Sequence, residues 1–143
     1  MLGTLAKWLR ILGFDTYYTN NLTDDLEVIK IAKKEKRILL TMDKNFIYQA
    51  RRENISVIEI STTELDEQLK IALENVEINQ DLILTRCLIC NSTLNYIKKN
   101  DVKAKIPDRV FESNDKFWYC KNCNKIYWKG THYDKMLEKI LKI

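Results

Sequence analysis

The stretch KFWYCKNCNKIYWKG, residues 116–130, decides the fold of the C-terminal part of this 143-residue chain. It holds one Cys-x-x-Cys pair, Cys120 and Cys123, and residues 87–90, CLIC, hold another, Cys87 and Cys90. Each such turn can deliver two thiolates to one metal ion, and two turns complete the four ligands of tetrahedral zinc. Because no coordination position stays open, we predict a structural Zn²⁺ site formed by these four cysteines.

Other uses of the four cysteines stay open at this point. A thioredoxin-like redox pair needs one Cys-x-x-Cys motif, whereas this chain has two. An iron–sulfur cluster would accept the same four thiolates. Disulfides fit the paired spacing less well than metal does, so we expect reduced cysteines and a cytoplasmic protein.

The residues around the cysteines predict a small zinc ribbon. Aromatic and β-branched residues flank the second pair and favour strands, and another strand is expected over residues 94–98. The 29 residues between Cys90 and Cys120 predict an inserted loop or hairpin. A mobile loop is expected to carry Lys98, Lys99, Lys103 and Lys105. A last helix should run from about His132, docked by Met136, Leu137, Ile140 and Leu141.

The N-terminal half shows alternating helix and strand patterns. Apolar residues at helical spacing predict a helix over residues 1–12, with Lys7 and Arg10 on its opposite side and Gly13 as a left-handed cap. Residues 14–18 are expected to form a short strand. Asp24, with Glu27 three residues later, predicts the start of a helix that reaches about residue 36. Its buried stripe is expected to be Leu26, Ile29 and Ala32.

Two strand and helix pairs follow in sequence. Residues 37–42, RILLTM, form an apolar run typical of a buried parallel strand, and a short helix should follow to residue 52. Residues 55–60, ISVIEI, predict the next strand, and Thr62 or Thr63 the cap of a helix reaching about residue 74. This order favours an α/β domain with a parallel sheet over residues 1–80, followed by a zinc-ribbon domain with a C-terminal helix over residues 81–143.

Composition and charge narrow the class of protein. Hydrophobic residues make up 45% and charged residues 31%, which is ordinary for a soluble globular chain. We expect neither a membrane span nor a signal peptide. Residues 81–143 carry 13 Lys and Arg against 7 Asp and Glu, a balance of +6, whereas residues 1–80 carry 11 against 13, a balance of −2. A basic surface attracts polyanions, most often nucleic acid.

Aromatic and basic residues alternate in the second half, a mixture that can stack bases and neutralise phosphates. The candidate RNA-binding residues are Lys121, Lys125, Trp128, Lys129 and His132. Packing of Trp118 and Trp128 against the cysteine turns and the α/β domain is the alternative. RNA is the expected partner, and a larger ribonucleoprotein such as the ribosome is one setting in which the protein would meet it.

Three acidic residues are candidates for a second metal site. Asp43 ends a predicted parallel strand, and ligands collect outside the carboxyl ends of such strands. Asp24 and Asp25 open the preceding helix, so the three carboxylates could hold Mg²⁺ or Mn²⁺ and position water against a phosphodiester. Each also has a structural explanation, because Asp24 and Asp43 suit helix caps and Asp25 suits a first helical turn.

Several segments together resemble one family. MLGTLAKWLRILGFD, DDLEVIKIAKKEKRILLTMD, CLIC, CKNC and IYWKGTHYDKM, in this order, are similar to the Mut-seven C-terminal RNase domain family, PIN-like nuclease domains that carry a zinc ribbon. The resemblance implies a PIN-like α/β domain, a fused ribbon and metal-dependent RNA cleavage. It implies that Asp24 or Asp25 and Asp43 bind the catalytic metal, and it places Trp128 and His132 in the family's closing segment.

The chain departs from that pattern at its start. PIN-like domains begin with a strand that ends in an acidic residue, whereas this chain starts at what should be the first helix, so the first strand and its aspartate are expected to be missing. The first functional hypothesis is therefore an RNA-binding protein derived from a PIN-like ribonuclease, with catalysis left open. The alternatives are an active ribonuclease that uses Asp24, Asp25 and Asp43, and a zinc-stabilised protein-interaction module.

Overall fold

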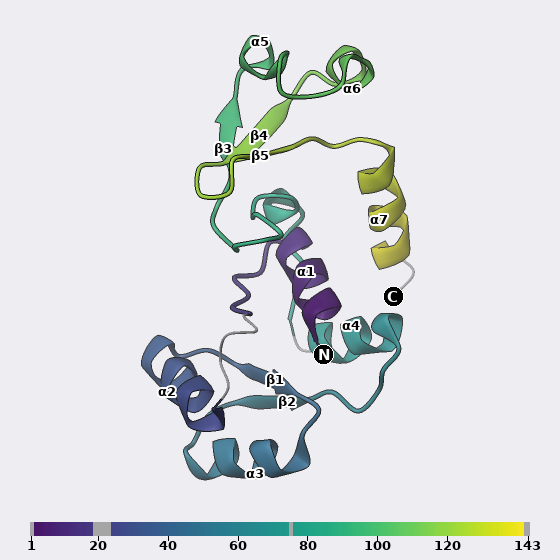
Figure 1. The fold of residues 1–143 in the computed structure, drawn as a ribbon. Coiled ribbons are helices and arrows are strands. Elements are labelled where there is room, and N and C mark those ends of the chain that lie inside the picture. Colours follow the sequence, from purple (N-terminus) through teal and green to yellow (C-terminus); the bar gives the residue numbers. More distant parts are fainter. Residues whose placement is uncertain (1, 19–23, 75, 142–143) are drawn as a thin grey trace. The chain divides into compact units, whose positions relative to one another are not determined.

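The computed structural model describes residues 2–18, 24–74 and 76–141 (Figure 1). The chain forms two compact units, one of Met1–Trp8 and Thr16–Ile78, the other of Leu9–Asp15 and Asn79–Ile143. Helix α1, Gly3–Ile11, contributes residues to both units. The division into domains at residues 80 and 81 stays a prediction. Among the described residues, no helix is both long and apolar enough to cross a lipid bilayer.

The first unit is a mixed α/β structure with a parallel pair of strands, as the sequence predicts. Strand β1, Leu39–Thr41, pairs with β2, Val57–Glu59, and helix α3, Lys44–Arg52, connects them. Helix α2, Asp25–Glu35, precedes β1, and α4, Leu65–Leu73, follows β2. Both strands are shorter than the apolar runs that predict them, because only three residues of each strand pair with the other strand.

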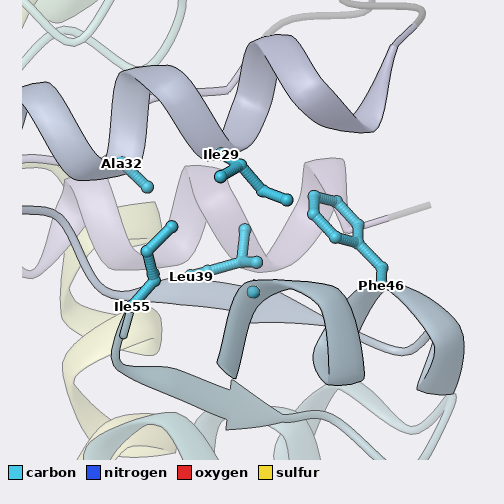
Figure 2. Close-up of a cluster of buried hydrophobic side chains, with 6 residues drawn as sticks. Ile29, Ala32, Leu39, Phe46 and Ile55 are labelled. Carbon is cyan, nitrogen blue, oxygen red and sulfur yellow. The ribbon is translucent and has the colours of Figure 1, made fainter. Parts of the chain in front are cut away.

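The core of this unit joins α2, α3 and the paired strands. In Figure 2, Ile29 and Ala32 point from α2 toward Leu39, Phe46 and Ile55. Leu26, expected in the same stripe, is 62% exposed, so that prediction is wrong. The α2 residues that pack in this core are Val28, Ile29 and Ala32, all of which follow Leu26 in the helix.

Two local predictions fail in the loops around this core. Described residues 14–18 form no strand, because the Phe14 N–H bonds back to the Leu9 carbonyl at 3.0 Å and turns the chain at the end of α1. Helix α4 is capped by Glu64 rather than by Thr62 or Thr63. Thr62 stands before the helix, where its hydroxyl accepts from the Glu64 N–H and its carbonyl accepts from the Gln68 side chain.

The second unit contains a three-stranded antiparallel sheet, which includes the strands expected near residues 94–98 and beside the second cysteine pair. In its described residues the strands are β3, Asn95–Ile97, β4, Phe117–Cys120, and β5, Lys125–Tyr127, in the order β3-β4-β5. The 3-10 helix η1, Gln80–Leu82, comes before them, and helix α7, Thr131–Leu141, follows them with Ile140 buried. The end of β4 carries Cys120, so the sheet leads directly into the second cysteine turn (Figure 1).

The insertion between the cysteine pairs contains two short helices, so Lys99 lies in a helix and not in the expected loop, while Lys98, Lys103 and Lys105 lie outside the helices. Helices α5, Lys99–Val102, and α6, Asp108–Ser113, connect β3 to β4. Val102 is fully buried, and the ammonium groups of Lys99 and Lys103 lie 4.9 and 5.9 Å from the centre of the Phe111 ring. Burial of one apolar residue and these cation–π contacts give the segment a defined structure.

Gly13 closes helix α1 with the backbone geometry that the sequence predicts. It has a φ of +94°, its N–H bonds to the Arg10 carbonyl, and the next residue bonds to Leu9, which is a Schellman cap. A Cβ at this position would collide with the Leu82 carbonyl. The Leu84 N–H donates to the Ile11 carbonyl at 2.8 Å, so the segment that follows η1 is bonded directly to the end of the helix.

A Gly13→Ala variant should be destabilised by more than about 1 kcal/mol, because it combines a strained positive φ with a backbone collision. Denaturant unfolding followed by far-UV circular dichroism measures the loss. Gly130→Ala is the matched control, since its Cβ would meet Trp128 side-chain atoms at 3.2 Å and no positive φ is needed there. Equal stability of the two variants would contradict this account of Gly13.

Candidate metal centre

The four predicted cysteines come together in the second unit. Their Sγ atoms all lie within 4.8 Å of one another, and those of Cys90 and Cys120 are 3.4 Å apart. A tetrahedral ion with metal–sulfur bonds of about 2.3 Å needs sulfurs about 3.8 Å apart, so the spacing suits a single ion. Cys87 and Cys120 are fully buried and the other two are half-buried. Over residues 2–18, 24–74 and 76–141, no other group of three or more His, Cys, Asp or Glu residues meets this spacing.

Both cysteine turns have the same backbone design. An asparagine follows the second cysteine of each pair, and Asn91 and Asn124 have φ values of 70° and 55°. The N–H of Asn91 donates to the Cys87 carbonyl at 2.9 Å, and that of Asn124 to the Cys120 carbonyl at 2.8 Å. Asparagine tolerates this left-handed conformation better than most residues, so it closes each turn and turns both thiols toward one point.

A buried arginine from α1 supports the first turn. Nη1 of Arg10 donates to the carbonyls of Leu88 and Ile89 at 2.8 and 3.1 Å, and the residue is 5% exposed. The expectation that Arg10 lies on a polar helix face is therefore wrong. Carbonyls inside a tight turn cannot bond to each other, and a guanidinium with several donors can reach two of them at once.

Tyr127 of β5 contacts one of the four thiols directly. Its hydroxyl lies 3.2 Å from Cys87 Sγ and accepts from the Leu88 N–H at 3.1 Å. Because the Leu88 N–H already donates to this oxygen, the hydroxyl proton can point at the sulfur. Burial raises the pKa of Tyr127, and the neighbouring thiol raises it further, so the hydroxyl stays a donor. A ligand with such a donor is fixed in orientation and carries less free negative charge.

The hydrogen bonds among the thiols divide them into two pairs. Burial opposes ionisation of Cys90, but hydrogen bonds with Ser92 and Asn122 outweigh it and lower its pKa to about 6. The pKa of Cys87 is also lowered. Burial raises it, but hydrogen bonds with Tyr127 and with the backbone of the turn lower it by more. The hydrogen bond with Cys90 raises the pKa of Cys123 to about 12, and burial raises that of Cys120. Cys87 and Cys90 are therefore the thiols that ionise more readily, and Cys120 and Cys123 must first lose their protons to bind a metal.

Nearly the whole chain also matches a known family. The family model described as Mut7-C RNAse domain matches residues 1–140. The chain belongs to the Mut7-C RNAse domain family. No curated protein and no solved structure matches it. The resemblance noted in the order of the sequence segments is thus confirmed at the level of the family.

In this Mut7-C chain the acidic candidates all stand at helix starts in the first unit. Asp24 caps α2, with Oδ1 accepting from the Leu26 N–H at 3.0 Å. Asp43 caps α3, with Oδ1 accepting from Asn45 and Phe46 at 2.9 and 3.2 Å. Asp25 lies in the first turn of α2. All three are exposed, and in the described residues they do not form a group close enough to share one ion.

The basic and aromatic candidates lie on and after β5, apart from Lys121 in the second cysteine turn. Lys121, Lys125 and Lys129 are exposed, and Trp128 is half-buried against Gly130. Nζ of Lys125 lies 5.5 Å from the centre of the Tyr127 ring. Nζ of Lys129 lies 5.4 Å from Trp118 and 5.3 Å from Tyr133. The side chain of His132 is outside what the structure describes.

Sequence reasoning missed the residues that support the metal site. Arg10, Tyr127, Asn91 and Asn124 all bond to a cysteine turn, yet none had been assigned to it. One signal was present, because both pairs continue as Cys-x-x-Cys-Asn. The other two contacts join residues about forty and eighty positions apart, which no local pattern can reveal.

Metal binding at pH 7 should release at least two protons, one each from Cys120 and Cys123, whose pKa values are raised above the usual value of a thiol. Protons then compete with the metal, so affinity should rise with pH. Calorimetric titration of metal-free protein with Zn²⁺ in buffers of different ionisation enthalpy counts the protons. If Zn²⁺ binding released no protons, the assignment of protons to Cys120 and Cys123 would be contradicted.

Tyr127→Phe should lower zinc affinity by about tenfold or more, because the Cys87 sulfur loses its donor and the Leu88 N–H loses its acceptor. Competition with a chromogenic chelator measures the change. Tyr119→Phe is the matched control. Tyr119 lies on β4 next to Trp118, the residue that pairs with Tyr127, so its side chain points to the other face of the sheet. Equal affinities for wild type and Tyr127→Phe would remove Tyr127 from the site.

Proposed function

We propose that this member of the Mut7-C RNAse domain family is an RNA-binding protein whose basic second unit is held in shape by a zinc ion. The observation that carries the proposal is the convergence of Cys87, Cys90, Cys120 and Cys123 at single-ion spacing in a unit rich in lysine. The family description, an RNAse domain, supports RNA as the polyanion that this unit meets.

The four cysteine ligands favour zinc over other metals. Four thiolates in tetrahedral array are typical of zinc or iron–sulfur sites. A cluster places several irons and bridging sulfides between its thiolates, which needs a wider cavity than sulfurs within 4.8 Å of one another leave. With four protein ligands no position remains for substrate or water, so the ion would stabilise structure and perform no reaction.

Charge and chemistry support RNA contact by the second unit. Its residues 81–143 carry a balance of +6, which four thiolates on one divalent ion would reduce by 2 without reversing it. The proposed contact residues are Lys121, Lys125, Trp128, Lys129 and His132. Lys125 and Lys129 already lie against aromatic rings, which keeps their ammonium groups near apolar surfaces on which bases can stack.

Further observations support a PIN-like fold and a cytoplasmic location. The parallel β1–β2 pair with α3 between the strands suits a PIN-like domain. Four unpaired thiols favour a reducing compartment, which supports a cytoplasmic location. A larger ribonucleoprotein such as the ribosome would offer RNA in a fixed shape to such a basic surface.

An active ribonuclease is the second candidate, and the family match favours it. In that function Asp24, Asp25 and Asp43 would hold Mg²⁺ or Mn²⁺ beside the scissile phosphate, which requires their carboxylates to come closer together than they lie in this structure. Asp43 follows β1 on the carboxyl side of the parallel pair, which is where such sheets bind ligands. The caps of α2 and α3 use Oδ1 of Asp24 and Asp43, and each carboxylate has a second oxygen that can face an ion.

One experiment tests both candidates. Zinc-loaded protein should bind a labelled unstructured RNA with an affinity that falls steeply as salt rises, because phosphate contacts release counterions. Removal of zinc with a chelator should abolish this binding. The same RNA incubated with Mn²⁺ should stay intact in the wild type if the function is binding alone.

The controls distinguish the outcomes of that experiment. RNA cleaved by the wild type and spared by Asp43→Asn would support the ribonuclease. Cleavage by both proteins alike would refute the acidic site. An absence of salt-dependent binding would refute the RNA function and leave a zinc-stabilised protein-interaction module.

A further inference from the structure

One face of the β3-β4-β5 sheet carries a row of aromatic residues from three different strands. The register pairs Tyr96 with Trp118 and Trp118 with Tyr127. Residues directly opposite each other in antiparallel strands point to the same face, about 5 Å apart at Cβ. The three side chains therefore form one row across the sheet.

Exposure changes steadily along this row. Tyr127 is 7% exposed and its hydroxyl is bonded at the first cysteine turn. Trp118 is half-buried in the central strand, and Tyr96 on the edge strand β3 is 61% exposed. One end of the row is thus anchored at the metal centre, while the other presents an aromatic ring to solvent.

Two lysine ammonium groups lie against rings of this row. Nζ of Lys129 lies 5.4 Å from the centre of the Trp118 ring, and Nζ of Lys125 lies 5.5 Å from that of Tyr127. Strands β3, β4 and β5 contain no Asp or Glu. Because Lys129 covers one side of Trp118, the ring left for a ligand is that of Tyr96.

We propose that Tyr96 is a base-stacking residue and Lys129 a phosphate-binding residue of a platform for single-stranded RNA on this face. The inference rests on the proposed RNA function and names the surface that serves it. A single strand supplies what the platform fits, an unpaired base with an open face and a phosphate beside it. A duplex keeps its bases stacked on one another and offers no such face. The Tyr127 contact with the cysteine turn fixes the far end of the row, so the platform depends on the metal centre for its shape.

Two variants separate stacking from charge. Tyr96→Ala should weaken binding of a short labelled unstructured RNA by about tenfold and leave the slope of log affinity against log salt unchanged. Tyr96→Phe should bind like the wild type, because the ring is kept. Lys129→Gln should reduce the slope by about 0.7, the value for one phosphate contact on a single strand. Fluorescence anisotropy over a series of salt concentrations measures both quantities.

Tyr48→Ala is the matched control. Tyr48 is 65% exposed, lies on α3 of the first unit and, like the proposed platform, has a cation near its ring, Arg52 at 5.8 Å. The Tyr48→Ala variant should bind RNA with the affinity of the wild type. Unchanged circular dichroism and zinc content of Tyr96→Ala would show that the exposed substitution leaves the fold intact.

The failures of the two proposals are distinguishable. If the wild type binds RNA with a steep salt dependence and Tyr96→Ala binds equally well, the platform is wrong and the RNA function stands. If polyphosphate, which has no bases, competes as well as RNA per phosphate, the surface recognises charge alone and the platform is wrong. If the wild type fails to bind single-stranded RNA, the RNA function and the platform both fall.

Discussion

The convergence of four thiols on one point is the constraint on which the second unit depends. Its strands are three or four residues long, and sheets of such short strands are only marginally stable by themselves. The metal centre joins the turn before β3 to the turn between β4 and β5, so one ion would fix both ends of the sheet. Structural zinc sites commonly contribute most of the folding free energy of units of this size.

The protein around the metal centre is organised to satisfy polar groups that the turns leave unpaired. Arg10 bonds to the carbonyls of the first turn, and Tyr127 bonds to its thiol and its N–H. Buried polar groups without partners are costly, so these two side chains make the close approach of backbone and sulfur tolerable. They also place the end of α1 and the edge of β5 at the same turn, which explains why residues 9–15 belong with the C-terminal part of the chain.

The two units differ in the charged and aromatic side chains that they expose. The first carries the exposed acidic residues Asp24 and Asp43, which cap helices α2 and α3. The second carries an excess of lysine and an aromatic row that ends in solvent. Membership of the Mut7-C RNAse domain family suggests RNA as a partner, and we propose from the balance of charge that the second unit makes the contact.

The sequence by itself determined the cysteine cluster, the parallel strand pair and the caps of α1, α2 and α3, because each is encoded by neighbouring residues. These local signals are Cys-x-x-Cys spacing, an apolar run, an Asp before a helix and a Gly after one. Only the tertiary structure decided that Arg10 is buried, that Leu26 is exposed and that Tyr96, Trp118 and Tyr127 share a face. Amphipathic spacing predicts which side of a helix is apolar, but it does not tell which segment covers that side or which distant carbonyls need a donor. Those contacts arise from the packing of segments far apart in the chain, so they are fixed when the fold closes.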